Sequence, residues 1–365
     1  MNRSPSAGLT VGVVGAAGHA GGELCRLLLG HPAVTEIVPV SRGGQCFARA
    51  HPNLLGSGLE FVRQERLAER AAELDAVFFC APAGEAMRSA RHYTDLGVPV
   101  IDLGADFRFA DPAEYRRVYG EEHSDSKLLT EAVYGVTELN RDRLRHARLV
   151  ANPGCYAITA ILGLAPLLAG GHLAPDGLVS IHAVNGTTGA GSSPKQAVMH
   201  AEMTGSMLSY NLEGHRHGPE LEAYFTALAG VPVPVDLNTA HGPFARGIHL
   251  QASLRLRGTW DRDELLRTYV AFYGAGHDKE PFVLVNDLPK QGARNDKDYD
   301  VYPAPGSVTG SNYCHIGLDH DADRSIAKVV AVTDNLVKGA AGSAIQNMNV
   351  MLGMEETWGL RHYAL

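Results

Sequence analysis

The first half of the chain alternates short apolar runs with longer segments whose apolar residues recur at helical spacing. The short runs predict β-strands at residues 9–14, 36–40, 76–80, 99–103 and 147–151. The longer segments predict helices at residues 21–30, 67–74 and 85–96. Strands that alternate with helices are typical of a parallel, doubly wound sheet. We therefore expect a Rossmann-like α/β domain over about the first 150 residues.

The pattern changes in the second half of the chain. A long apolar segment at residues 156–168 and a second segment at residues 220–229 predict helices. Strands are predicted at residues 178–184, 248–256 and 326–332, separated by long loops that contain Gly, Pro and His. We expect residues 153–332 to form a second, α+β domain. A final helix is expected over residues 334–352, where it can pack back on the first domain.

The composition narrows the class of protein. The 365 residues leave room for two domains, with 45% hydrophobic and 20% charged residues. The formal charge of -8 argues against a nucleic-acid partner. No apolar run has the roughly 18 to 20 residues that a membrane span needs, and the N-terminus lacks the pattern of a signal peptide. The five cysteines show no paired or zinc-binding spacing. We expect a cytoplasmic protein without a membrane or metal partner.

One cysteine lies where a reactive thiolate is favoured. In Asn152-Pro153-Gly154-Cys155, Asn is a good helix N-cap and Pro suits the first helical position. Cys155 is then expected in the first turn, where unpaired N–H groups and the helix dipole stabilise a thiolate. The alternative is a small, buried core residue, as most free cysteines are.

The first strand leads into a glycine-rich turn. Gly12, Gly15, Gly18 and Gly21 are spaced three apart, a variant of the dinucleotide-binding fingerprint that permits close approach of a pyrophosphate to a helix N-terminus. Such a turn can also be purely structural. At the end of the second strand, Ser41-Arg42 offers a hydroxyl and a cation where an NAD binder would have an acidic residue, which favours NADP(H). The alternative for Arg42 is a solvated surface arginine.

Other segments suit a proton shuttle and an anion site. Two histidines flank Arg216 in the stretch 215–220, and histidine moves protons near neutral pH. The glycine- and hydroxyl-rich stretch 185–193 can bind a phosphate or be a flexible loop. Arg108 follows a strand at the edge where such sheets bind ligands, and Arg246 is a second cation without an obvious local partner. Either arginine could instead form a structural ion pair. A thiolate beside a nicotinamide is suited to the interconversion of an aldehyde and an acyl derivative.

These residues resemble one family over nearly the whole chain. The markers are Gly15-Ala16-Ala17-Gly18-His19-Ala20-Gly21-Gly22-Glu23-Leu24, Ala105-Asp106-Phe107-Arg108, Asn152-Pro153-Gly154-Cys155-Tyr156, Gly186-Thr187-Thr188-Gly189-Ala190-Gly191, His215-Arg216-His217-Gly218-Pro219-Glu220, Gly310-Ser311-Asn312-Tyr313-Cys314 and the stretch 337–349. The chain is similar to the N-acetyl-gamma-glutamyl-phosphate reductases, within the group that includes aspartate-semialdehyde dehydrogenase.

The resemblance implies an activity and a division of the chain. The reaction is NADPH-dependent reductive dephosphorylation of an acyl phosphate to a semialdehyde, with release of inorganic phosphate, in arginine biosynthesis. The final helix belongs to the cofactor domain in this family. The first domain is then discontinuous, with residues 1–152 and 333–365 binding NADP and residues 153–332 serving catalysis and oligomerisation. A homo-oligomer, dimer or tetramer, is expected.

The resemblance also implies roles for single residues. Cys155 is the nucleophile and His217 the acid/base. The residues expected to contact the cofactor are Gly15, Ala17, Gly18, Gly21, Ser41, Arg42, Gly189, Gln346 and Asn347. Those expected to contact the substrate are Arg108, Asn152, His215, Glu220 and Arg246.

The sequence departs from the family at two places, and two alternative functions stay open. In the glycine turn, His19 and Ala20 replace two residues of the usual Ser-Gly-Tyr-Thr-Gly pattern, and two hydroxyl donors are lost with Ala17 and Ala20. The stretch 290–305 is longer and more charged than expected, and its composition fits either a mobile loop or an interface. One alternative is the same chemistry on a longer or carrier-linked acyl phosphate. The other is a non-catalytic NADP-binding protein in which Cys155 is oxidised reversibly.

Overall fold

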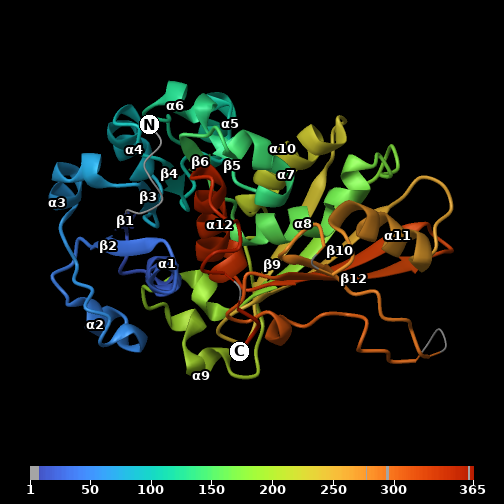
Figure 1. Cartoon of the computed structure of the whole chain (residues 1–365). Coiled ribbons are helices and arrows are strands. Elements are labelled where there is room, and N and C mark those ends of the chain that lie inside the picture. The colour runs from blue at the N-terminus through green and yellow to red at the C-terminus, as the bar shows by residue number, and fades with distance from the viewer. Residues whose placement is uncertain (1–7, 277, 293–295, 361) are drawn as a thin grey trace. The chain divides into compact units, whose positions relative to one another are not determined.

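The structure is a computed structural model that describes residues 8–276, 278–292, 296–360 and 362–365. The chain divides into two compact units (Figure 1). Unit 1 is Met1–Gly154 with Ala340–Arg361, and unit 2 is Cys155–Gly339 with His362–Leu365. Each unit is built on one sheet of its own.

Unit 1 contains a six-stranded parallel sheet. Its strand order is β2-β1-β3-β4-β6-β5. The strands are β1 (Leu9–Val14), β2 (Val34–Val40), β3 (Ala76–Phe79), β4 (Val100–Asp102), β5 (Val133–Tyr134) and β6 (Leu149–Ala151). After β1 the chain adds β2 on one side and then crosses to add β3 on the other, so the switch point of the sheet lies between β1 and β3. The expected doubly wound sheet is confirmed.

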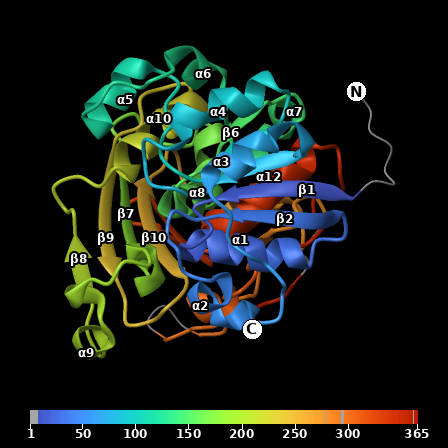
Figure 2. The same cartoon turned by 90° about the vertical axis from the view of Figure 1, so that its left-hand side faces the viewer.

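Helices surround this sheet, as Figure 2 shows for α1, α3 and α4. The helices of unit 1 are α1 (His19–Leu29), α2 (Phe47–Ala50), η1 (Pro52–Leu54), α3 (Gln64–Glu69), η2 (Ala71–Glu73), α4 (Ala86–Asp95), α5 (Pro112–Tyr119), α6 (Ser126–Glu131), α7 (Thr137–Leu144) and α12 (Gly342–Met351). All four residues of β3 are buried, as expected for a strand covered on both faces. The C-terminal helix α12 packs against α1, α7 and β4, which joins the two ends of the chain in one unit.

Unit 2 contains a seven-stranded mixed sheet. Its order is β11-β12-β13-β10-β7-β9-β8. The strands are β7 (Val179–Asn185), β8 (Leu208–Tyr210), β9 (Val235–His241), β10 (Ile248–Arg255), β11 (Val283–Val285), β12 (Cys314–Asp321) and β13 (Ile326–Thr333). Alternate residues of β10 are buried, which is the pattern of a sheet with one face on a core.

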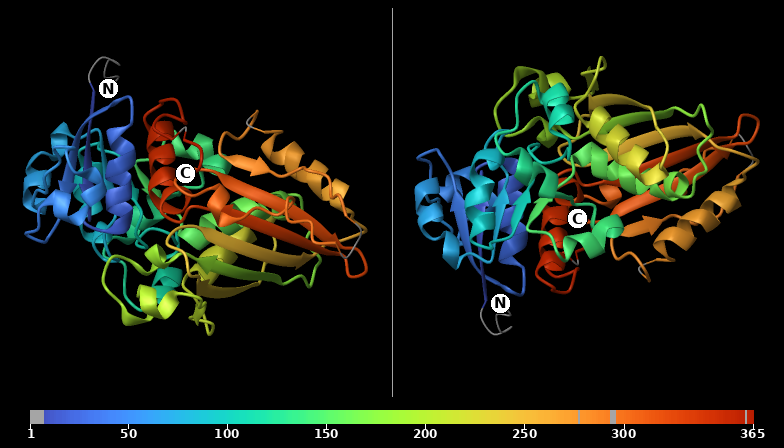
Figure 3. Two further views of the ribbon diagram at one scale, coloured as in Figure 1. Left: turned by 90° about the horizontal axis from the view of Figure 1, so that it is seen from below. Right: turned by 90° about the horizontal axis from the view of Figure 1, so that it is seen from above.

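Three helices pack on that sheet (Figure 3). The helices of unit 2 are α8 (Cys155–Ala169), η3 (Thr187–Ala190), η4 (Gln196–Val198), α9 (His200–Met203), α10 (His217–Ala229), α11 (Arg262–Tyr273), η5 (Pro305–Ser307) and the π-helical turn η6 (Val337–Ala341). The apolar helix α8 contacts β10, β12 and β13, with α10 and α11 beside it. Gly163 permits this contact, because an added Cβ would meet the Cβ of Ala331 at 3.1 Å.

Three local predictions differ from the structure. The helix predicted at residues 67–74 leaves α geometry at Arg70 and continues as a 3-10 turn. The final helix differs at its start: residues 337–341 form the π-helical turn η6, and α geometry begins only at Gly342. The carboxylate of Asp334 caps this start by accepting the N–H groups of Leu336 and Val337. The prediction that Pro153 is the first helical residue is also wrong, since α8 begins at Cys155.

Several elements were not predicted. They include β9, β12 and α11, which carry polar residues within the stretches expected to be loops. For α11 the sequence did hold a signal, since Asp261 and Glu264 form a capping box at its start. No helix within the described residues combines the length and the apolar character needed to cross a membrane.

Candidate active site

The turn between β1 and α1 forms a backbone cradle at the switch point of the unit 1 sheet. Gly15 has φ +78, and an added Cβ would meet the carbonyl oxygen of Cys80 at 2.6 Å, so only glycine fits without strain. Gly21 is equally tight, because its Cβ would meet Ala16 at 2.6 Å. Gly18 is the N-cap of α1 and has no capping side chain. The positive end of α1 therefore faces the turn at Ala17 and Gly18, where a phosphate would be favoured.

The next two residues expected to bind the cofactor follow β2. Arg42 forms an ion pair with Glu85, and its side chain is 72% exposed. Ser41 Oγ accepts a hydrogen bond from the N–H of Gly43 at 3.2 Å. The arginine thus has an acidic partner that the sequence did not predict, but its exposed guanidinium can still reach an anion.

A buried carboxylate and an arginine lie at the carboxyl end of β4. Arg108 Nη2 donates to the carbonyl oxygen of Leu103 at 3.1 Å. The fully buried Asp102 accepts the N–H of Gly104 at 2.8 Å through Oδ1. Burial, with a smaller contribution from Asp106, raises the pKa of Asp102 to about 7. Asp106 accepts from two backbone N–H groups at the start of α4 and thereby anchors the same loop.

Buried amides fix the end of β6, just before the cysteine. Asn152 Nδ2 donates to the carbonyl oxygen of Ala340 at 3.2 Å, and its Oδ1 accepts from Ser343 and from Asn347 at 3.1 Å. Asn152 is therefore not the cap of α8, because its amide is used by α12. Gln346 donates to Glu138 at 3.0 Å and to Glu356 at 2.8 Å. Gln346 and Asn347 are fully buried, so their side chains hold unit 1 together.

Cys155 is the first residue of α8 and lies against the end of β7. Its side chain is partly buried, and Asn185 Nδ2 lies 3.8 Å from its Sγ. Gly339 also packs against Cys155, since an added Cβ there would meet the Cβ of Cys155 at 3.0 Å. A donor amide and the N-terminus of a long helix both favour the thiolate.

The two predicted histidines gather around the residue next to Cys155. The Tyr156 ring has edge contacts with His215 at 5.5 Å and with His217 at 5.8 Å, and the two imidazoles are 4.6 Å apart. His215 Nδ1 accepts the N–H of His217 at 3.1 Å. Glu220 is buried with its carboxylate 3.9 Å from His217 Nε2. His215, His217 and Glu220 are thus brought together with the Cys155 segment.

Sequence reasoning missed two aromatic groups of this cluster. The Tyr210 hydroxyl lies 2.8 Å from the Tyr156 hydroxyl, and the Tyr210 ring stacks on His241 at 4.5 Å. Burial raises the pKa of Tyr156 and of Tyr210, and a charged Cys155 raises both further, so both phenols stay protonated beside a thiolate. Burial lowers the pKa of His241. Tyr210 and His241 lie on different strands, and no spacing in the sequence links them.

Arg246 has a buried partner that the sequence did not show. Its Nε lies 3.0 Å from Asp334 Oδ2, and Nη2 donates to Oδ1 at 3.1 Å. The same carboxylate accepts the N–H of Gly310 at 2.7 Å. Asp334 therefore joins Arg246 to the π-helical turn that carries Gly339, and the arginine remains 22% exposed.

The predicted anion loop is more constrained than a flexible loop. The N–H groups of Thr187 and Thr188 donate to the carbonyl oxygens of Phe244 and Ala245 at 2.9 and 3.1 Å. Gly189 packs on the Asn185 side chain, which an added Cβ would meet at 2.1 Å. The stretch thus supports Asn185 and offers fewer free donors than expected.

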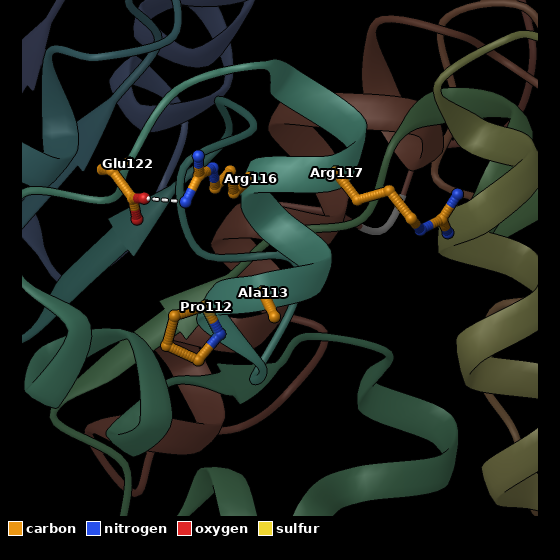
Figure 4. A pocket seen from close by; sticks show the side chains of 5 residues that line it. All are labelled: Pro112, Ala113, Arg116, Arg117 and Glu122. Atoms are coloured by element: carbon orange, nitrogen blue, oxygen red, sulfur yellow. Dashed lines mark ion pairs between the residues drawn. The ribbon is translucent and has the colours of Figure 1, made fainter.

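Pockets also occur away from these residues. One lies at the start of α5 and is lined by Pro112, Ala113, Arg116, Arg117 and Glu122 (Figure 4). Its two guanidinium groups point in opposite directions, and that of Arg116 pairs with Glu122 at 2.6 Å. Both side chains of that pair are about 70% exposed, so this is a surface groove with internally paired charges.

Comparison with known proteins places both units in one group. The family model described as "Semialdehyde dehydrogenase, NAD binding domain" matches residues 10–147. The model described as "Semialdehyde dehydrogenase, dimerisation domain" matches residues 155–335.

Whole-chain relatives carry a more specific name. The chain is 42% identical over 359 residues to the N-acetyl-gamma-glutamyl-phosphate reductase of Halorhodospira halophila, covering 98% of this chain and 99% of the relative. The corresponding protein of Nitrosomonas europaea is 39% identical over 360 residues, with 98% and 99% covered.

Solved structures share the fold at low identity. An aspartate semialdehyde dehydrogenase II from Vibrio cholerae matches with a TM-score of 0.70 at 15% identity, covering 95% of this chain and 99% of that one. An aspartate semialdehyde dehydrogenase with NADP from Candida albicans matches with a TM-score of 0.64 at 17% identity, covering 94% and 98%.

Proposed function

Because the chain belongs to the family of N-acetyl-gamma-glutamyl-phosphate reductases, we propose that Cys155 and His217 carry out the reductive dephosphorylation of N-acetyl-gamma-glutamyl phosphate. The enzyme is an oxidoreductase of arginine biosynthesis that uses NADP(H). The observation that carries the residue assignment is the cluster of His215, His217 and Tyr156 around the segment that begins α8 with Cys155.

The proposed cofactor site uses groups of unit 1. The backbone cradle at Gly15, Ala17, Gly18 and Gly21 and the N-terminus of α1 fit a pyrophosphate, and Ser41 with Arg42 fits a 2′-phosphate. NADPH, when bound, supplies the hydride. Gln346 and Asn347 are proposed to act indirectly, by holding Asn152 at the end of β6. Gly189 likewise acts by supporting Asn185.

The proposed chemistry begins at Cys155. Its thiolate attacks the acyl carbon, a C–S bond forms, and the C–O bond to phosphate breaks with release of inorganic phosphate. Asn185 and the helix N-terminus stabilise the thiolate before attack and again when it leaves. Reduction of the thioester gives a hemithioacetal oxyanion. His217 donates a proton to that oxygen and takes it back as the C–S bond breaks, so that the semialdehyde and the Cys155 thiolate are released. Glu220, 3.9 Å from His217 Nε2, stabilises the imidazolium that donates this proton.

Two arginines are proposed to bind the anionic groups of the substrate. Arg246 keeps its orientation through Asp334, and Arg108 through the carbonyl of Leu103. The match of residues 155–335 to a dimerisation domain supports a homo-oligomer, and we propose that it acts in the cytoplasm.

The reverse reaction tests this assignment. N-acetylglutamate semialdehyde, phosphate and NADP⁺ should produce NADPH, measured by absorbance. Cys155→Ala should lower the rate by at least about 1,000-fold, as removal of a nucleophile does. Cys314→Ala removes a buried thiol from β12 and should keep activity. Full activity in the Cys155→Ala variant would exclude the thioester mechanism.

A further inference from the structure

Tyr156 is a buried aromatic residue to which the proposed mechanism gives no role. It follows Cys155 in the first turn of α8 and is 1% exposed. Consecutive residues of an α-helix point about 100° apart, because a turn has about 3.6 residues. The thiol and the ring therefore leave the same turn in different directions. The thiol lies near Asn185, whereas the ring lies against the two histidines at the start of α10.

The Tyr156 ring is one wall of the space that holds both imidazoles. Its centroid is 5.5 Å from that of His215, at an interplanar angle of 84°, and 5.8 Å from that of His217, at 71°. The two imidazoles are 4.6 Å apart and inclined by 75°. Three rings in mutual edge contact leave little room for any one of them to rotate, because protein interiors are closely packed. Loss of the Tyr156 ring would therefore let the His217 imidazole change its orientation.

The Tyr156 hydroxyl fixes this ring to two strands of the unit 2 sheet. It donates to the carbonyl oxygen of Ala240 on β9 at 3.2 Å. A phenol has one proton, so the hydroxyl of Tyr210 on β8, 2.8 Å away, is the donor of the bond between the two phenols. Burial raises the pKa of both phenols, so both hydrogen bonds persist at neutral pH. The ring is thus held against the histidines from the side of the sheet.

The orientation of His217 matters for only one half of the proposed reaction. The thiolate of Cys155 first displaces phosphate and forms the thioester. His217 acts afterwards, when it moves the proton of the hemithioacetal. A group that only orients His217 should therefore leave the first half-reaction intact and slow the second.

We propose that Tyr156 is a positioning residue that holds the imidazole of His217 for proton transfer and takes no part in the acylation of Cys155. This role rests on the proposed function, because it assumes the tasks given there to Cys155 and His217. The nucleophile and the residue that orients its acid/base are then neighbours in one helical turn.

The two half-reactions of Tyr156→Leu test this role. Leucine keeps an apolar side chain but removes the ring and its hydroxyl. Mixing the full chain with N-acetyl-gamma-glutamyl phosphate and NADP⁺ should still release about one equivalent of phosphate per chain, at an unchanged rate. The steady-state kcat with NADPH should fall by at least about 100-fold, because general acid/base catalysis contributes that much or more. Unchanged turnover would overturn the proposal.

Tyr269→Leu is the matched control. Tyr269 is also fully buried, and its hydroxyl donates to the carbonyl oxygen of Gly163 at 2.6 Å, about two turns further along α8. This variant removes a ring and a hydrogen bond of the same kind from the same helix, so it should lower the melting temperature and keep kcat. An equal fall of kcat in the two leucine variants would show a general effect of α8 and contradict the positioning role.

A phenylalanine pair covers the case in which a leucine variant does not fold. Tyr156→Phe keeps the ring and loses only its two hydrogen bonds, so kcat should fall by about three- to tenfold and most of the activity lost in Tyr156→Leu should return. The phosphate burst with NADP⁺ should be unchanged. Tyr269→Phe should leave kcat as it is in the unmodified chain. Equal kcat in Tyr156→Phe and Tyr269→Phe would overturn the proposal.

Failure of this role and failure of the proposed function give different results. If the unmodified chain releases no phosphate with NADP⁺, the proposed function fails. If it does release phosphate, and Tyr156→Leu loses the phosphate burst and the turnover to the same extent, the proposed function stands. Tyr156 is then a residue that places Cys155, and its assignment to His217 fails.

Discussion

At the scale of single residues, the two phenol groups of the candidate site, those of Tyr156 and Tyr210, stay protonated. Tyr156 and Tyr210 are buried and hydrogen-bonded to each other, and burial raises the pKa of both phenols. The negative charge of a Cys155 thiolate is then the charge that the surrounding donors stabilise. The side-chain amide of Asn185, 3.8 Å from the sulfur, is one such group.

Asp102 gives a prediction for the pH dependence of stability. Its pKa is about 7 in the folded chain and about 3.9 when unfolded, so the folded state holds the extra proton between these values. The contribution of Asp102 to stability is present below about pH 4 and is lost as the pH rises toward 7, by at most about 1.4 kcal/mol per pH unit. Asp102→Asn removes this loss.

The measurement is a pair of melting temperatures at several pH values. The melting temperature of Asp102→Asn minus that of the unmodified chain should increase between pH 5.5 and pH 7.5. The increase should be of the size expected when unfolding of the unmodified chain releases about one proton. Carboxyls with a lowered pKa, such as Asp125 and Asp319, also make stability depend on pH. Their effect is the same in both proteins and cancels when one melting temperature is subtracted from the other. A difference that stays constant with pH would show that Asp102 is ionised throughout.

At the scale of elements, the π-helical turn η6 lies against Cys155, the proposed nucleophile. The turn is set by Asp334, whose carbonyl oxygen accepts the N–H of Gly339 at 2.8 Å. Gly339 in turn lies against Cys155. Single π turns inside helices occur often at functional sites, and this one brings a glycine to the side chain of the proposed nucleophile.

Gly339→Ala tests this arrangement. The added methyl meets Cys155 at 3.0 Å, so one of the two must move. We expect kcat to fall by about 10- to 100-fold, since small misplacements of a reacting group have effects of that size. The unfolding free energy should fall by only about 1 to 3 kcal/mol. Gly306→Ala is the matched control, because its Cβ would meet nothing within 4 Å; equal kcat in the two variants would contradict the positioning role.

Elements with one dominant signal could be predicted from the sequence. The strand β3 and the helix α8 are continuous apolar runs, which the sequence shows directly. The two-residue strand β5 was not predicted. The strand β9, with the sequence Val-Asp-Leu-Asn-Thr-Ala-His, could not be predicted, because its polar residues are paired with neighbours far along the chain. The π-helical start of the final helix depends on contacts of Asp334 with the N–H groups of Leu336, Val337 and Gly339, which a periodicity argument does not include.

At the scale of the whole molecule, the features that could not be predicted from the sequence depend on contacts between residues far apart in the chain. Residues from both ends of the chain form unit 1, where Arg141 pairs with Glu356 at 2.7 Å and His31 Nε2 lies 2.9 Å from Asn349 Oδ1. The resemblance predicted the cofactor, the activity and the family. It did not predict the partner of Arg246 or the Tyr210 and His241 pair, because each depends on residues that meet only in the folded chain.

The central claim is that Cys155 forms a thioester before any hydride is transferred. The most direct measurement mixes the full chain with N-acetyl-gamma-glutamyl phosphate and NADP⁺ in place of NADPH. We predict rapid release of about one equivalent of phosphate per chain, and an N-acetylglutamyl adduct on the peptide that contains Cys155. Phosphate release that requires NADPH from the first turnover, with no adduct on Cys155, would contradict the account.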